Sequence, residues 1–110
     1  MSNSGNSIKD DAIREIAASG GGGLTTSYQA LGPAYLRDSF RTWFTNNTNG
    51  DIYLSTDGVT NMKKLPANSG RAADEKTNDM FRKQGTQWYI KYASAPGTPV
   101  GWAAIEVEYV

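Results

Sequence analysis

The sequence predicts an all-β fold: a small antiparallel β-sandwich, jelly-roll-like or immunoglobulin-like, preceded by a short N-terminal helical arm. The first reason is that apolar and polar residues alternate in several short stretches after residue 24, as they do in strands that bury one face. The second is that turn-forming pairs separate these stretches. Two of them, Asn49-Gly50 and Asp57-Gly58, tolerate the positive φ angles of tight turns. About five or six short strands with turns between them are typical of a small sandwich or barrel.

Residues 36–66 predict three consecutive strands that pair as an antiparallel meander. In the middle strand, residues 51–56, Ile52 and Leu54 share one face. The Asn-rich segment before this strand and the Asp-Gly pair after it are then expected to form hairpin turns. The return strand, residues 59–65, is expected to end at Pro66.

Three further strands are expected over residues 24–31, 86–92 and 101–110, and residues 68–82 are expected to form an irregular polar connection. The last two strands alternate clearly, so one face of each is expected to be apolar and buried. The residues on these faces are Trp88, Ile90, Tyr92, Ala103, Ile105, Val107 and Tyr109.

The first 23 residues form a separate arm in this prediction, and residues 24–110 form the β-sandwich domain. An amphipathic pattern predicts a helix over about residues 7–19, followed by a linker of glycines at residues 20–23. The arm is either a loose linker or a segment that docks on a neighbouring subunit, and a short helix favours docking because it is marginal unless its apolar face is covered. The docking residues would be Ile8, Ile13 and Ile16.

The composition disfavours several classes of function. The 110 residues carry eleven basic and eleven acidic side chains, which argues against a broad electrostatic contact with nucleic acid. The absence of histidine and cysteine removes the commonest general base and the commonest metal ligands, so no catalytic residue, cofactor or metal is expected. Asp51 and Asp57 could coordinate a hard cation, but turn chemistry explains both better. No apolar run reaches the roughly 18 to 20 residues of a membrane span, so no membrane contact is expected either.

Four aromatic residues alternate with the apolar residues of their own strands and are therefore expected on the opposite strand face: Trp43, Tyr53, Tyr89 and Trp102. Such residues are either scattered aromatics on a solvated face or anchors at a subunit contact, since Trp and Tyr are favoured at interfaces. Oligomerisation is expected because a small β-domain without disulfides or metal has a limited core. A homo-oligomer is therefore predicted, with these aromatics as interface residues.

The order of strands and turns resembles that of small virion structural proteins of tailed bacteriophages. The similar segments are residues 25–32, 45–61, 65–69, 85–91 and 101–109. The resemblance implies a compact β-sandwich without catalytic residues that serves as a building block of the head, neck or tail.

The expected function is that of a non-enzymatic structural protein, a capsid decoration protein or a head-tail connector component. It would be located in the virion, assembled in the host bacterial cytoplasm, with other virion proteins as its partners. The alternative is a carbohydrate- or receptor-binding module in which Trp43, Tyr53, Trp88 or Trp102 stacks on a sugar ring.

Overall fold

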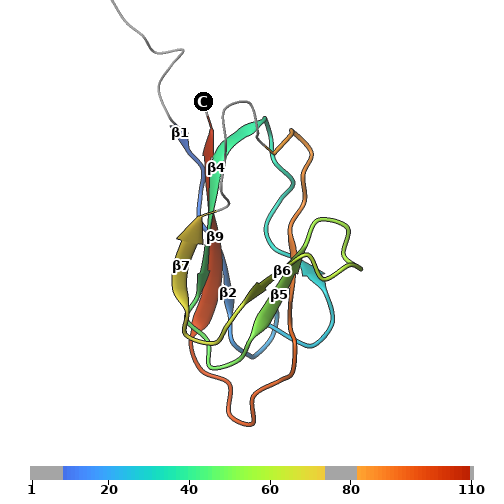
Figure 1. Cartoon of the computed structure of the whole chain (residues 1–110), viewed down its shortest axis with the longest axis vertical. Coiled ribbons are helices and arrows are strands. Elements are labelled where there is room, and N and C mark those ends of the chain that lie inside the picture. The colour runs from blue at the N-terminus through green and yellow to red at the C-terminus, as the bar shows by residue number, and fades with distance from the viewer. Residues whose placement is uncertain (1–8, 74–81, 110) are drawn as a thin grey trace, which may run out of the picture.

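The computed structural model describes residues 9–73 and 82–109, which form two antiparallel sheets and contain no helix (Figure 1). We call the five-stranded sheet, with the order β1-β9-β4-β7 and with β2 also paired to β9, sheet A. We call the four-stranded sheet, with the order β3-β8-β5-β6, sheet B. The strands of sheet A are β1 (Lys9–Asp10), β2 (Arg14–Ala17), β4 (Ser39–Asn46), β7 (Gly70–Ala73) and β9 (Trp102–Tyr109). Those of sheet B are β3 (Gln29–Ala30), β5 (Ile52–Ser55), β6 (Lys63–Leu65) and β8 (Tyr89–Tyr92).

The core lies between the two sheets and takes side chains from both. Phe44 of β4 meets Trp88, which precedes β8, edge to face with ring centroids 5.0 Å apart. The Trp88 indole donates a hydrogen bond to the hydroxyl of Tyr35, and the Tyr92 hydroxyl donates one to the carbonyl of Ala18. The faces expected to be buried in residues 86–92 and 101–110 are confirmed, because all of their expected core residues are buried.

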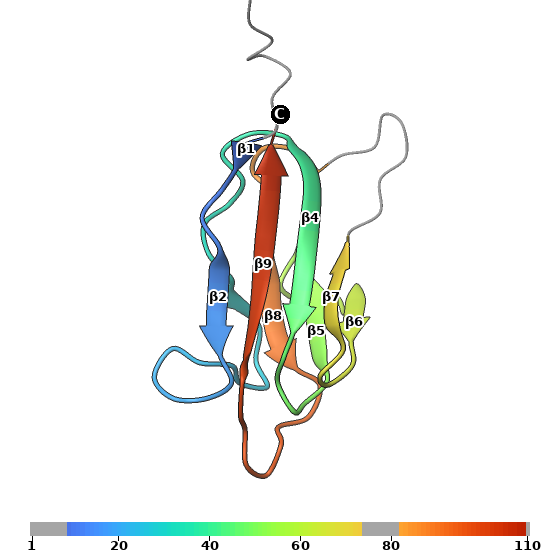
Figure 2. The ribbon, with the colours of Figure 1, turned by 90° about the vertical axis from the view of Figure 1, so that its left-hand side faces the viewer.

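The predicted N-terminal helix is wrong for the described part of residues 7–19. Residues 9–17 instead contain β1 and β2, both antiparallel to β9 (Figure 2). Along β2, Arg14 and Ile16 are buried while Glu15 and Ala17 are exposed, which is the two-residue period of a strand. Strand pairing prevails because the β9 edge provides hydrogen-bond partners, whereas an isolated helix of this length is marginal.

The predicted meander is also only partly correct. β5 and β6 form the expected hairpin, with Ile52 opposite Leu65. β4 and β5, however, belong to different sheets, so the segment between them is a corner and not a hairpin turn. Two other expectations change in extent: residues 24–31 contribute only the short β3, and the connection over residues 68–82 contains β7.

Asn46 makes this corner. It ends β4 at an inward-facing position and is fully buried. Its Nδ2 group donates to the carbonyls of Gly50, Leu65 and Pro66, each at 3.0 Å. Its Oδ1 atom accepts from the amide and the hydroxyl of Thr48, at 2.9 and 2.7 Å. One carboxamide therefore joins the end of β4, the corner and the end of β6.

We expect Asn46→Ala to lower the free energy of unfolding by about 3 kcal/mol, because buried carbonyl groups lose their donor and each costs about 1–3 kcal/mol. Urea denaturation measures this change. The matched control is Asn49→Ala, since the Asn49 amide makes its contacts at the exposed surface. A loss below about 1 kcal/mol for Asn46→Ala would show that the network is not a structural determinant.

The corner also packs against the start of β9, where Gly101 has φ +96°. A Cβ atom at this position would overlap the carbonyl oxygen of Asn47. We expect Gly101→Ala to destabilise the protein by about 2 kcal/mol or more, through both the backbone strain and this overlap. Gly97→Ala is the control, because no atom lies within 4 Å of its Cβ position. Equal melting temperatures for the two variants would contradict the prediction.

Candidate functional site

The structure divides the predicted interface residues among three environments. Ile13, Trp43 and Trp102 lie on the outer face of sheet A, where Ile13 is 61% and Trp102 38% exposed and Trp43 is half-buried. Tyr53 and Tyr89 are half-buried on the outer face of sheet B. Ile16 lies in the core of its own chain. Ile8 lies outside the described residues.

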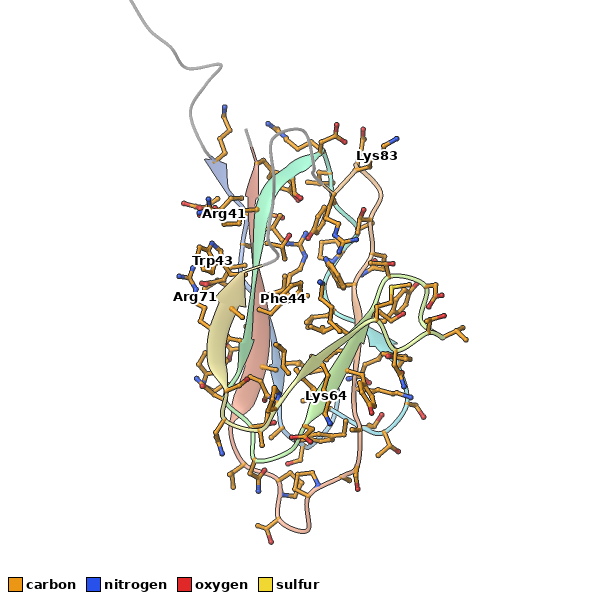
Figure 3. All side chains as sticks on the ribbon, in the orientation of Figure 1. Arg41, Trp43, Phe44, Lys64, Arg71 and Lys83 are labelled. Carbon is orange, nitrogen blue, oxygen red and sulfur yellow. The ribbon has the colours of Figure 1, made fainter. Side chains whose placement is uncertain are left out.

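Trp43 is the centre of the outer face of sheet A. Figure 3 shows its side chain on the outer side of β4, together with Arg41 and Arg71, while Phe44 points the other way into the core. The guanidinium carbon of Arg71 lies 4.0 Å from the centroid of the Trp43 ring, and that of Arg41 lies 5.4 Å from it. Arg71 also pairs with Glu106 of β9 at 3.1 Å. The indole is thus held among cations that the neighbouring positions supply.

Beside Trp43 is a hollow of about 320 Å³. Its wall consists of Ile13, Val107, Trp43, Arg71 and four carboxylate residues, Asp10, Asp11, Glu106 and Glu108. Two of these carboxylates already have partners. Asp11 pairs with the buried guanidinium of Arg14 at 3.0 Å and accepts a hydrogen bond from the Tyr109 hydroxyl, and Glu106 pairs with Arg71. The hollow therefore combines an apolar and aromatic wall with an excess of negative charge.

Two buried polar atoms on this face have no hydrogen-bond partner among the described residues. They are Nε1 of Trp43, a donor, and Oε1 of Glu108, an acceptor. Buried polar atoms in folded proteins are nearly always partnered. Because both atoms are buried, a partner could reach them only if the side chains around them moved.

On the outer face of sheet B, the tyrosines make contacts within the chain. The Lys91 ammonium lies 4.6 Å from the centroid of the Tyr28 ring and 5.9 Å from that of Tyr53. The Tyr28 hydroxyl donates to Oδ1 of Asn61 at 2.6 Å. Burial raises the pKa of Tyr28 above its ordinary value, so this hydroxyl stays protonated and can donate. These contacts serve to tie the loop after β5 to the sheet.

The two aspartates considered as cation ligands have turn roles. Asp57 accepts hydrogen bonds from the Ser55 hydroxyl and from the backbone amides of Val59 and Thr60. Asp51 accepts from the amide of Ala67 and faces the Lys64 ammonium at 3.6 Å. Within residues 9–73 and 82–109, no group of three or more acidic, His or Cys side chains is placed to hold a metal ion.

No protein-family model matches the chain, and no curated protein or solved structure matches it. The part of the chain that the structure describes has no helix that could cross a membrane. The function is therefore argued from the side chains of the two outer faces. Strand parity identified Trp43 and Trp102, and the apolar pattern of the expected helix identified Ile13. Sequence reasoning missed the charged residues around them, which lie on strands far apart in the chain.

The hydrogen bonds to Asp57, led by the one from Ser55, hold the pKa of its carboxyl well below its ordinary value. A lowered folded-state pKa stabilises the protein above the unfolded pKa of about 3.9, and this contribution is lost as the pH falls toward the folded pKa. We expect the stability difference between wild type and Asp57→Asn to shrink from about pH 5 to about pH 2. Urea denaturation at several pH values measures it. A difference that stayed constant over this range would contradict the assignment.

Proposed function

We propose that the chain is a non-enzymatic structural protein of a tailed-phage virion, a capsid decoration protein or a head-neck-tail component, that acts through contacts between subunits. In this proposal the two sheets form a jelly-roll-like or immunoglobulin-like sandwich, and other virion proteins are the partners. The resemblance of the strand-and-turn order to such virion proteins supports the class. The observation that carries the proposal is the outer face of sheet A, with Trp43, its two arginines and the unpartnered atoms beside them.

This face has the composition of a protein interface. Tryptophan and arginine are the residue types most enriched at positions that dominate binding energy. Ile13 and Trp102 add exposed apolar surface to the same face. The face also has a firm base, because Ile105 and Val107 of the central strand β9 are fully buried on the opposite side. A rigid surface binds with less entropic cost than a mobile loop.

The carbohydrate- or receptor-binding alternative has weaker support. Trp88 is only 1% exposed, and the Arg71 guanidinium lies against the Trp43 ring, so neither is open to stack on a sugar. The remaining candidates, Tyr53 and Trp102, belong to different sheets and face opposite sides of the molecule. A binding site with several aromatic residues on one surface is therefore not formed by these four.

The test is whether the protein is present in virions and whether the outer face of sheet A holds it there. Particles of the phage that carries the coding sequence are purified and analysed by quantitative mass spectrometry, with tagged variants supplied in trans. We expect wild type and Tyr53→Ala to be incorporated in defined copy number and Trp43→Ala to be reduced at least about tenfold, as for a central interface tryptophan.

Each alternative outcome has a definite meaning. Absence of the wild-type protein from purified particles would overturn the proposed function. Normal incorporation of Trp43→Ala would reject this face as the contact. The circular dichroism and melting temperature of each variant establish that it is folded before the particles are compared.

A further inference from the structure

The charges on the outer face of sheet A are divided between its two halves. Figure 2 views this face with β9 in the middle, β1 and β2 on one side, and β4 and β7 on the other. The strand pairing puts Asp10, Glu108 and Arg41 in one row across β1, β9 and β4. The next row places Glu106 opposite Trp43. Carboxylates thus occupy the β1–β9 half, and the guanidinium groups of Arg41 and Arg71 occupy the β4–β7 half.

We propose that this face binds a second copy of the same chain across a two-fold axis that runs close to the strand direction, between β9 and β4. Rotation by 180° about this axis leaves each row of residues at the same position along the strand direction. It places the β1–β9 half of one copy over the β4–β7 half of the other. The acidic half of each copy then faces the basic half of the other, as a self-complementary contact requires. This inference deepens the proposed function and rests on it for its biological role, because it names a partner for the same surface.

The central contact in this arrangement is Arg41 of one copy in the acidic hollow of the other. Most residues of the hollow belong to the β1–β9 half, and Trp43 and Arg71 of the other half complete its wall. The two-fold axis brings the partner's row with Arg41 over the row with Asp10 and Glu108. A guanidinium group suits the hollow because its several N–H donors pair with carboxylates such as those of Asp10 and Glu108. In the adjacent row, the Trp43 indole faces the partner's carboxylate at position 106.

The size and the net charge of the molecule suit a reversible dimer. With strands about 4.8 Å apart and about 3.4 Å of rise per residue, the face around the long strands β4 and β9 covers roughly 500 Å² on each copy. The total of roughly 1,000 Å² is at the lower end for specific protein contacts, so micromolar affinity is expected. The formal net charge of zero means that two copies do not repel one another at long range.

The experiment uses two charge reversals, Arg41→Glu and Glu108→Arg, in the full chain. Sedimentation velocity and light scattering over a wide concentration range give the mass and the dimer dissociation constant. We expect wild type to dimerise and each variant alone to have a dissociation constant raised at least about tenfold, because like charges then face each other across the axis.

An equimolar mixture of the two variants should form heterodimers about as tightly as wild type. In each variant chain, the neighbouring positions 41 and 108 carry like charges, and mixing does not change this. A recovered dimer affinity can therefore come only from opposite charges that pair between the two chains. Lys83→Glu is the matched control, because it makes the same charge change at an exposed position that lies on the other side of the molecule from Trp43 and Arg41 (Figure 3). It should dimerise as wild type does.

A wild-type protein that stays monomeric at high concentration would overturn this inference, and so would a mixture no tighter than the separate variants. If a charge reversal prevents folding, Arg41→Gln replaces it, and an unchanged dissociation constant for that variant also overturns the inference. The virion experiment tests the proposed function separately from the dimer. If the protein is monomeric but present in particles, the proposed function stands and the dimer is rejected. If the protein is dimeric but absent from particles, the dimer stands and the proposed function is rejected.

Discussion

The arrangement of the two sheets depends on the buried carboxamide of Asn46. This group has both donors and an acceptor, so it satisfies carbonyl groups of the corner and of the β6 end while its own oxygen is satisfied by Thr48. No apolar residue of similar size could do both. Because β4 is also paired with β9 and β7, a displacement at the corner would move sheet A relative to sheet B. The core contact between Phe44 and Trp88 depends on this placement.

Alternation predicted the strands whose inward positions are all apolar. β5, β8 and β9 were found in this way, together with the side that each buries. The method failed for residues 9–17, because Arg14 is an inward residue there and its charge conceals the period of two. The guanidinium is buried against the Tyr35 ring and paired with Asp11, and neither partner could be known before the fold. The spacing of the isoleucines then matched a helical face by coincidence.

The Asn-Gly turn and the interface residues show a second limit of prediction from local sequence. An asparagine-rich turn with glycine fits a hairpin and a corner between sheets equally well, so local sequence could not assign β4 and β5 to sheets. Strand parity could place Trp43 and Trp102 on an outer face. The neighbours that give this face its chemistry, Arg71 and the carboxylates, are brought there by long-range strand pairing, which no local pattern encodes.

The position of β9 in sheet A affects how the protein is made. β1, β2 and β4 all pair with β9, the latest described strand along the chain. During synthesis, most of the sheet's hydrogen bonds must wait until the ribosome has released this strand. Until then β2 and β4 have unpaired backbone edges and uncovered apolar side chains, a condition that promotes aggregation. Sheet A therefore forms in the cell only after β9 has been synthesised, and the yield of folded protein depends on how well the incomplete chain is protected at the ribosome exit.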